Sequence, residues 1–133
     1  MAKFMTKFEG EAYAALRIIA GLMFVLHGST KLFSFPEAAP TQMPIPMLYV
    51  AGGIEFVAGA MIAVGFQTRW AAFLSAGLMA AAYWMVHGLN HLLPHINKGE
   101  LAVLYCFIFL YIAAKGPGKW SLDVGTRASS SAA

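Results

Sequence analysis

The chain has 133 residues, of which 59% are hydrophobic and only 11% are charged. Because about a quarter of the residues of a soluble domain are charged, this composition excludes a soluble enzyme and indicates an integral membrane protein. The formal net charge of +3 comes from cations scattered between hydrophobic runs, as is typical of residues that set membrane topology. We therefore expect the lipid bilayer as a partner, and no nucleic acid.

Four hydrophobic runs follow one another along the chain, separated by segments rich in proline, glycine or polar residues. The first three are long enough for the ~20 residues that a helix needs to cross a bilayer. The fourth is shorter, but Asn97 followed by Glu100 is typical of a capping box, so we expect this helix to begin at Lys98. The sequence predicts an all-α fold, a single-domain integral membrane four-helix bundle with helices at about 11–33, 47–66, 69–90 and 98–115.

The basic residues indicate an orientation for this bundle. In a four-span arrangement, one side carries most of the cations, namely Lys3, Lys7, Arg69, Lys115, Lys119 and Arg127. The other side carries Lys31 and Lys98. Since cytoplasmic loops are enriched in Lys and Arg, we expect both the N- and the C-terminus in the cytoplasm. The polar tail at 124–133 is expected to be disordered unless a partner orders it.

Glu55 is the most informative residue of the second run, because an ionisable side chain at the bilayer centre costs about 2.5–3.5 kcal/mol on insertion scales. Ala51, Gly59 and Ala63 share its helix face at i, i+4 spacing. Small residues let a neighbouring helix approach closely, so Glu55 should point into the bundle. Two interpretations stay open, a buried polar clamp that fixes packing or a carboxylate that carries protons or binds a ligand.

The first run offers a complementary face. Residues recur on it at helical spacing, namely Arg17, Gly21, Phe24, Gly28 and Lys31. Antiparallel packing places Glu55 at a depth between Arg17 and His27, so we expect one of them as its partner, Arg17 by charge pairing or His27 by hydrogen bonding. Glu55, Arg17 and His27 are therefore the candidate catalytic residues.

The histidines fall toward the non-cytoplasmic side of this arrangement, and they are His27, His87, His91 and His95. The i, i+4 spacing of His87 and His91 can hold a metal or haem iron if the third helix continues. Pro94 interrupts that continuation, and the single cysteine, Cys106, has no partner. We therefore expect no metal or haem, and we expect histidines that are hydrogen-bonded within a loop.

Aromatic residues near the predicted helix ends are typical of the belt at a membrane interface. Tyr83, Trp84 and Tyr105 lie closer to the histidine side, where they also suit the wall of a site for a flat ring such as a quinone. The candidate cofactor-binding residues are His27, Lys31, His87, Tyr83 and Trp84.

Short motifs occur in a fixed order along residues 13–124. They are Arg17, then His27-Gly28-Ser29-Thr30-Lys31-Leu32-Phe33, Gly52-Gly53-Ile54-Glu55, Gly65-Phe66-Gln67-Thr68-Arg69, Asn97-Lys98-Gly99-Glu100-Leu101-Ala102 and Gly116-Pro117-Gly118-Lys119-Trp120-Ser121-Leu122-Asp123. This ordered set resembles the DoxX family of small bacterial membrane proteins. The resemblance implies four helices, a place in the bacterial inner membrane, and a polar set of Arg17, His27, Lys31, Glu55, Arg69, Glu100 and Asp123.

The resemblance also implies a functional setting. The family is named after its likeness to the membrane subunit of an archaeal thiosulfate:quinone oxidoreductase, and its members are associated with redox or oxidative-stress systems. We therefore expect a subunit of a quinone-linked membrane system that works with other membrane subunits or with further copies of itself, rather than a stand-alone enzyme. The alternative is a non-catalytic accessory subunit that packs against a larger complex.

Overall fold

The computed structural model describes residues 3–89 and 91–123, and all the regular structure within these ranges is helical. The elements in chain order are α1 (Lys3–Thr6), α2 (Glu9–Phe33), α3 (Ile45–Val64), α4 (Thr68–Ala82), the π-helical turn η1 (Tyr83–Gly88), α5 (Pro94–Asn97) and α6 (Glu100–Lys115). The predicted all-α fold is confirmed for these residues. The predicted polar tail at 124–133 lies outside them.

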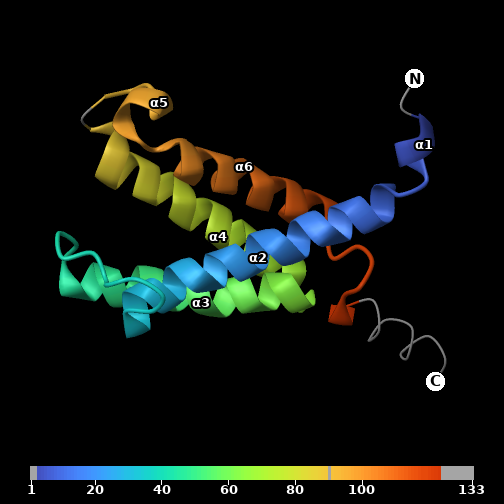
Figure 1. Cartoon of the computed structure of the whole chain (residues 1–133), viewed down its shortest axis with the longest axis horizontal. Coiled ribbons are helices and arrows are strands. Elements are labelled where there is room, and N and C mark those ends of the chain that lie inside the picture. The colour runs from blue at the N-terminus through green and yellow to red at the C-terminus, as the bar shows by residue number, and fades with distance from the viewer. Residues whose placement is uncertain (1–2, 90, 124–133) are drawn as a thin grey trace.

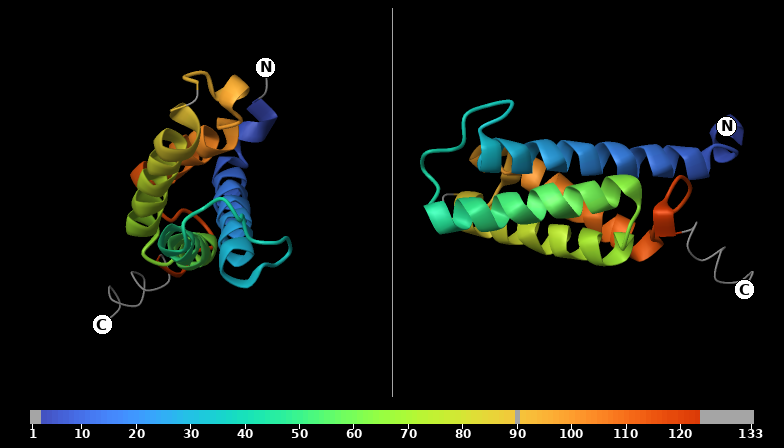
Figure 2. Two further views of the ribbon diagram at one scale, coloured as in Figure 1. Left: turned by 90° about the vertical axis from the view of Figure 1, so that its left-hand side faces the viewer. Right: turned by 90° about the horizontal axis from the view of Figure 1, so that it is seen from below.

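The long helices form two antiparallel pairs, α2 with α3 and α4 with α6 (Figure 1). The pairs meet at the tight turn between α3 and α4, and they splay apart toward the opposite end, which we call the open end (Figure 1). The α2–α3 loop and η1 lie at this open end. The right-hand view of Figure 2 shows α2 and α3 side by side along their length.

Three helical segments are long and apolar enough to cross a membrane, namely Glu9–Phe33, Ile45–Val64 and Thr68–Gly88, the last of which combines α4 and η1. α6 has 16 residues, which reach only about 24 Å at the α-helical rise. Length and composition therefore establish three candidate spans among the described residues, and the predicted fourth requires a separate argument.

The start of α6 differs from the capping box that the sequence predicts. Lys98 adopts a left-handed conformation with a φ of 60°, and the side-chain oxygen of Asn97 accepts a hydrogen bond from the Gly99 N–H at 2.8 Å. These two residues close a turn instead of starting a helix. α6 therefore begins at Glu100, two residues later than predicted, whereas its end at Lys115 agrees with the prediction.

The contact between α2 and α3 depends on glycine. A Cβ atom added to Gly28 would lie 2.4 Å from the backbone nitrogen of Phe56, and one added to Gly21 would lie 2.6 Å from that of Ala63. Two helices approach this closely only where side chains are missing or small. The structure thus confirms the small-residue face predicted around Glu55.

An aromatic core joins the two helix pairs. The Phe24 ring of α2 lies 4.7 Å from the Phe109 ring of α6, and the Tyr105 ring stacks on Phe109 at 5.4 Å between centroids. Large apolar side chains remain exposed on every long helix, among them Ile19, Val57, Phe73 and Phe107. Exposed apolar surface on all sides is the arrangement expected of a bundle that is surrounded by lipid.

Candidate functional site: a buried ion pair beside a cavity

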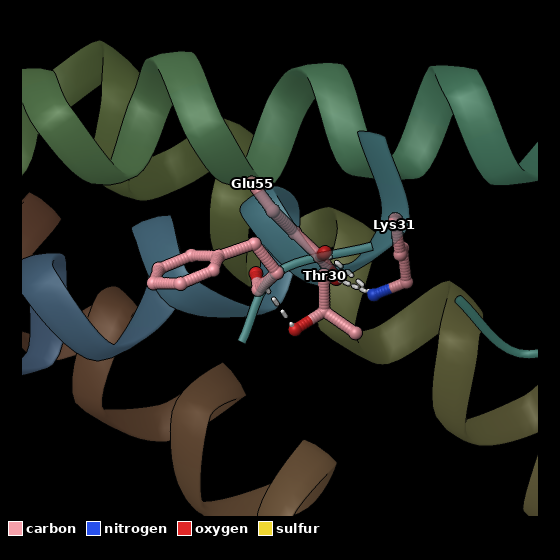
Figure 3. A network of polar contacts seen from close by, with 4 residues as sticks. Thr30, Lys31 and Glu55 are labelled. Carbon is pink, nitrogen blue, oxygen red and sulfur yellow. Dashed lines mark hydrogen bonds and ion pairs between the residues drawn. The ribbon is translucent and has the colours of Figure 1, made fainter. Parts of the chain in front are cut away.

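Lys31 and Glu55 form an ion pair toward the open end of the bundle. The Lys31 ammonium donates hydrogen bonds to both Glu55 carboxylate oxygens, at 2.6 and 2.5 Å. Figure 3 shows the two side chains pointing toward each other, Lys31 from α2 and Glu55 from α3. Only 14% of the Lys31 side chain and 4% of the Glu55 side chain are exposed. Glu55 therefore points into the bundle, as the sequence predicts.

The partner of Glu55 is not the expected one. Helix depth alone predicts Arg17 or His27, but the four-carbon side chain of Lys31 extends beyond the depth of its own backbone. A lysine near a helix end can extend its stem along apolar surface and place its charge elsewhere. His27 remains close enough to Glu55 for an electrostatic interaction, and its ring contacts Tyr105 edge-on at 5.9 Å.

A cavity of about 250 Å³ lies against this ion pair. Apart from Lys31 and Glu55 its wall is apolar and comes from α3, α4, η1 and the loop before α3, with Met43, Met47, Val50, Ala51, Leu78, Met79, Ala81, Ala82, Met85 and Val86. Val50, Met85 and Val86 are also exposed, so the cavity opens on the outer surface of the bundle. An apolar pocket with a few convergent polar groups is typical of a small-molecule site.

The Lys31–Glu55 pair gives this cavity both kinds of hydrogen-bonding chemistry. The ammonium is a donor with three N–H groups, and the carboxylate is an acceptor that can also carry a proton. Because the two charges offset each other, an apolar wall can hold them at lower cost than either charge alone. The cavity is therefore suited to a small, mainly apolar molecule that carries a hydrogen-bonding group.

Arg17 lies at the other end of the bundle and is fully buried. Its guanidinium donates to the carbonyls of Ile62 and Ala63 in the last turn of α3, at 2.5 and 2.7 Å. It also donates to the carbonyls of Lys119 and Trp120, at 3.1 and 2.7 Å. Arg17 thus completes a helix C-terminus and fixes the segment after α6, and it does not line the cavity.

Arg69 and Asp123 have comparable roles at this end. Arg69 donates to the last three carbonyls of α6, at 2.8, 2.6 and 3.3 Å. Asp123 accepts from the backbone N–H groups of Gln67, just before α4, and Thr68, its first residue, and from the Thr68 hydroxyl, at 2.8 to 2.9 Å. We call Arg17, Arg69 and Asp123 the helix-end clamp, because each satisfies groups that a helix terminus leaves unpaired. Their residue types and spacing do not predict this role.

Tyr83, Trp84 and His87 do not line the cavity beside the ion pair. The Tyr83 hydroxyl donates to the Leu92 carbonyl at 2.8 Å, and the Nδ1 atom of His87 lies 2.9 Å from the Asn97 carbonyl. Trp84 is exposed and packs edge-on against Tyr83. These contacts order the segment between η1 and α6, so the proposed grouping of His87 with Lys31 is not formed.

Of the remaining histidines, His91 lies in the segment after η1 and His95 lies in the short helix α5. The third long helix ends at Gly88, so His87 and His91 do not share a helix face at i, i+4 spacing. The Nδ1 atom of His91 accepts from the Leu93 N–H at 3.2 Å. His95 lies 3.1 Å from the Glu100 carboxylate, and both side chains are exposed. Within the described ranges, no three His, Cys, Asp or Glu side chains gather as a metal site.

Tyr105 of α6 contacts the His27 ring edge-on. It is buried, and its hydroxyl has no hydrogen-bond partner among the residues that the structure describes. It lies within electrostatic range of Glu55. A buried hydroxyl is costly when it is left unpaired, so the α6 side of the Glu55 site retains an unused hydrogen-bonding group.

Comparison with known proteins identifies the family. Residues 12–88 match the DoxX family. The chain belongs to the DoxX family. It is also 39% identical over 125 residues to an uncharacterized protein of Haemophilus influenzae. The aligned region covers 90% of this chain and 93% of that protein. No solved structure gives a significant match.

The family assignment confirms the resemblance predicted from the ordered motifs. The DoxX match contains α3, α4, η1 and nearly all of α2. It therefore includes both members of the Lys31–Glu55 pair and most of the cavity wall. Family membership and the three candidate spans together make this a membrane protein.

Proposed function

We propose that this DoxX protein is a subunit of a quinone-linked membrane system and that it binds a quinone headgroup at the Lys31–Glu55 pair. The observation that carries the proposal is the apolar cavity of about 250 Å³ with one ammonium and one carboxylate in its wall. This volume lies just below the range of about 300–1,000 Å³ that is typical of ligand pockets, and it suits a single ring better than a larger cofactor.

A bound quinone supplies two-electron, two-proton chemistry, with the electrons delivered by a redox partner subunit. The residues of this chain bind and orient the ring. Lys31 donates a hydrogen bond to a ring oxygen, and Glu55 holds or releases a proton at its carboxylate. The apolar wall excludes water and strengthens both interactions. The second candidate function is the accessory subunit, in which the same ion pair only joins α2 to α3.

The quinone proposal is tested by binding of duroquinone, which has no tail, to the purified protein in nanodiscs. Lys31→Met and Glu55→Gln should each weaken binding by about tenfold or more, as expected for the loss of a hydrogen bond to a charged group. Lys98→Met is the matched control, because this lysine does not line the cavity; its Kd should stay at the wild-type value.

Each single substitution also strands one buried charge, which by itself destabilises the fold. The double variant Lys31→Met/Glu55→Gln removes both charges and should fold, yet should bind duroquinone no better than the single variants. If the double variant binds as tightly as the wild type, or if the wild type shows no saturable binding, the accessory-subunit function is favoured instead.

We further propose that α6 is a fourth span and that both termini lie in the cytoplasm. The end of the bundle that holds the helix-end clamp also carries most of the cations, namely Lys3, Lys7, Arg69, Lys115 and Lys119. α6 runs antiparallel to α4, and its Leu104 and Phe107 side chains are exposed. Its ~24 Å length is met by local thinning of the bilayer and by the α5 turn at the interface. With both termini in the cytoplasm, the location that we propose is the inner membrane of a bacterium.

Labelling of single cysteines tests this topology in intact cells after Cys106→Ser. A cysteine at Thr41, in the α2–α3 loop, should react with a membrane-impermeant thiol reagent, because this loop faces away from the cytoplasm. One at Gln67, in the α3–α4 turn, should react only after permeabilisation. Labelling of the Gln67 position in intact cells would show that the orientation is inverted.

A further inference from the structure

A second cavity, of about 490 Å³, adjoins the first one at the open end. Its walls come from the α2–α3 loop, the start of α3 and η1, and they are formed by Pro40, Gln42, Met43, Pro44, Met47, Met85 and Val86. The first cavity shares four of these residues, namely Met43, Met47, Met85 and Val86. We call these four residues the methionine portal. Since they belong to both walls, the two cavities adjoin at these side chains.

The portal has an unusual backbone on one side. Met85 and Val86 belong to η1, where the third long helix becomes π-helical after Ala82. A π-helical turn holds an additional residue, so the side chains after it take a different direction from those of a regular α-helix. π-helical turns are rare in proteins, and those that occur often lie at functional sites. Here this turn contributes Met85 and Val86 to the same two cavity walls as Met43 and Met47.

The side chains of the portal favour one kind of occupant. Methionine is unbranched and flexible, and its polarisable thioether adapts to apolar ligands of irregular shape. Three of the four portal residues are methionines, and Met79 continues the same surface inside the first cavity. The polar end of the connected space is the Lys31–Glu55 pair. This arrangement fits a ligand with one oxygen-bearing head and one long apolar chain.

We infer that the methionine portal holds the apolar tail of the ligand whose headgroup binds at the Lys31–Glu55 pair, so that the substrate class is a quinone with a long single tail. This inference rests on the proposed function. The two cavities lie in series and share the portal, so a tail that leaves the first cavity there enters the second. The α2–α3 loop and η1 then determine which tails are accepted, whereas the ion pair determines which heads are accepted.

The test compares two probes in nanodiscs, duroquinone and a benzoquinone with a decyl chain. Met47→Gln and Met85→Gln keep the length of the side chain but make it polar. In both variants the decyl probe should bind about tenfold more weakly than in the wild type, as follows from losing the burial of about two methylene groups. Duroquinone meets Met47 and Met85 only in the wall of the first cavity, so its Kd should rise by about threefold at most in the same variants, less than the loss of one buried methylene group. Its retained binding shows that the variants are folded.

Met23→Gln is the matched control, because Met23 of α2 is also exposed but lines a different cavity. Both probes should bind this variant as they bind the wild type. If the portal variants weaken the binding of both probes equally, or weaken the binding of neither, the inference that the portal holds the tail is wrong. The outcome for the proposed function is separate, since that proposal fails when Lys31→Met leaves duroquinone binding unchanged.

Discussion

Replacing Arg17 with methionine should lower the free energy of unfolding by about 3–5 kcal/mol, the range reached when a buried hydrogen-bond network is broken. The guanidinium is fully buried and donates to four carbonyls from two separate segments. Methionine fills much of the space but provides no donor, so all four carbonyls lose this partner, and the bonds to Ile62 and Ala63 are lost from the buried part of the bundle. Thermal unfolding in mild detergent, followed by circular dichroism, measures the effect.

Arg69→Met is the matched control for this prediction. Arg69 also donates to the carbonyls at the end of a helix, but its side chain is exposed, and water can replace it. We expect a loss of about 1 kcal/mol or less. Arg17→Lys should rescue only part of the stability, because an ammonium lacks the planar fork that reaches both segments. If Arg17→Met and Arg69→Met lower the free energy of unfolding equally, the buried position of Arg17 does not give its hydrogen bonds a larger effect on stability.

Replacing Gly28 with alanine should separate α2 from α3 and cost about 2–3 kcal/mol, the upper part of the range for overpacking. The new methyl group would lie 2.4 Å from the Phe56 nitrogen and 2.7 Å from the Gly52 carbonyl oxygen. Both are backbone atoms of α3, so no side-chain rotation relieves the contact. The helices must move, and the Lys31–Glu55 pair, one turn further along, moves with them.

Two measurements check this prediction, the melting temperature in detergent and the Kd for duroquinone in nanodiscs. Gly28→Ala should lower the first and raise the second. Gly53→Ala is the control, because a Cβ at Gly53 meets no atom within 4 Å, and its stability should equal or exceed that of the wild type. A Gly28→Ala protein that melts with the wild type would show that the α2–α3 contact is looser than the structure has it.

The Lys31–Glu55 pair shows where prediction from the sequence ended. Periodicity placed Glu55 on a face of small residues and therefore in the bundle interior, and its burial confirms this. The predicted partners of Glu55, namely Arg17 and His27, were wrong, because depth along a helix reflects only the rise of the backbone and not the length of a side chain. The long Lys31 side chain covers the remaining distance, and its direction depends on how α2 is rotated against α3.

The helix-end clamp and the portal were also beyond the sequence. Arg17 and Asp123 belong to the motifs of the DoxX resemblance, but their partners are backbone groups more than 40 residues away along the chain, as in the bonds to Ile62 and Gln67. Backbone carbonyls and N–H groups have no signature in residue identity. The π-helical turn likewise carries no marker that distinguishes it from a regular continuation of α4.

The sequence by itself determined the membrane character, the all-α fold, the DoxX family and the close α2–α3 contact, because hydrophobic length and small-residue spacing are local properties that residue identity encodes. The tertiary structure alone decided that Lys31 is the partner of Glu55, that the helix-end clamp lies apart from them, and that a methionine-lined cavity adjoins the ion pair. These features depend on the rotation and splay of helices relative to one another. That geometry results from the packing of the whole bundle, so no single segment specifies it.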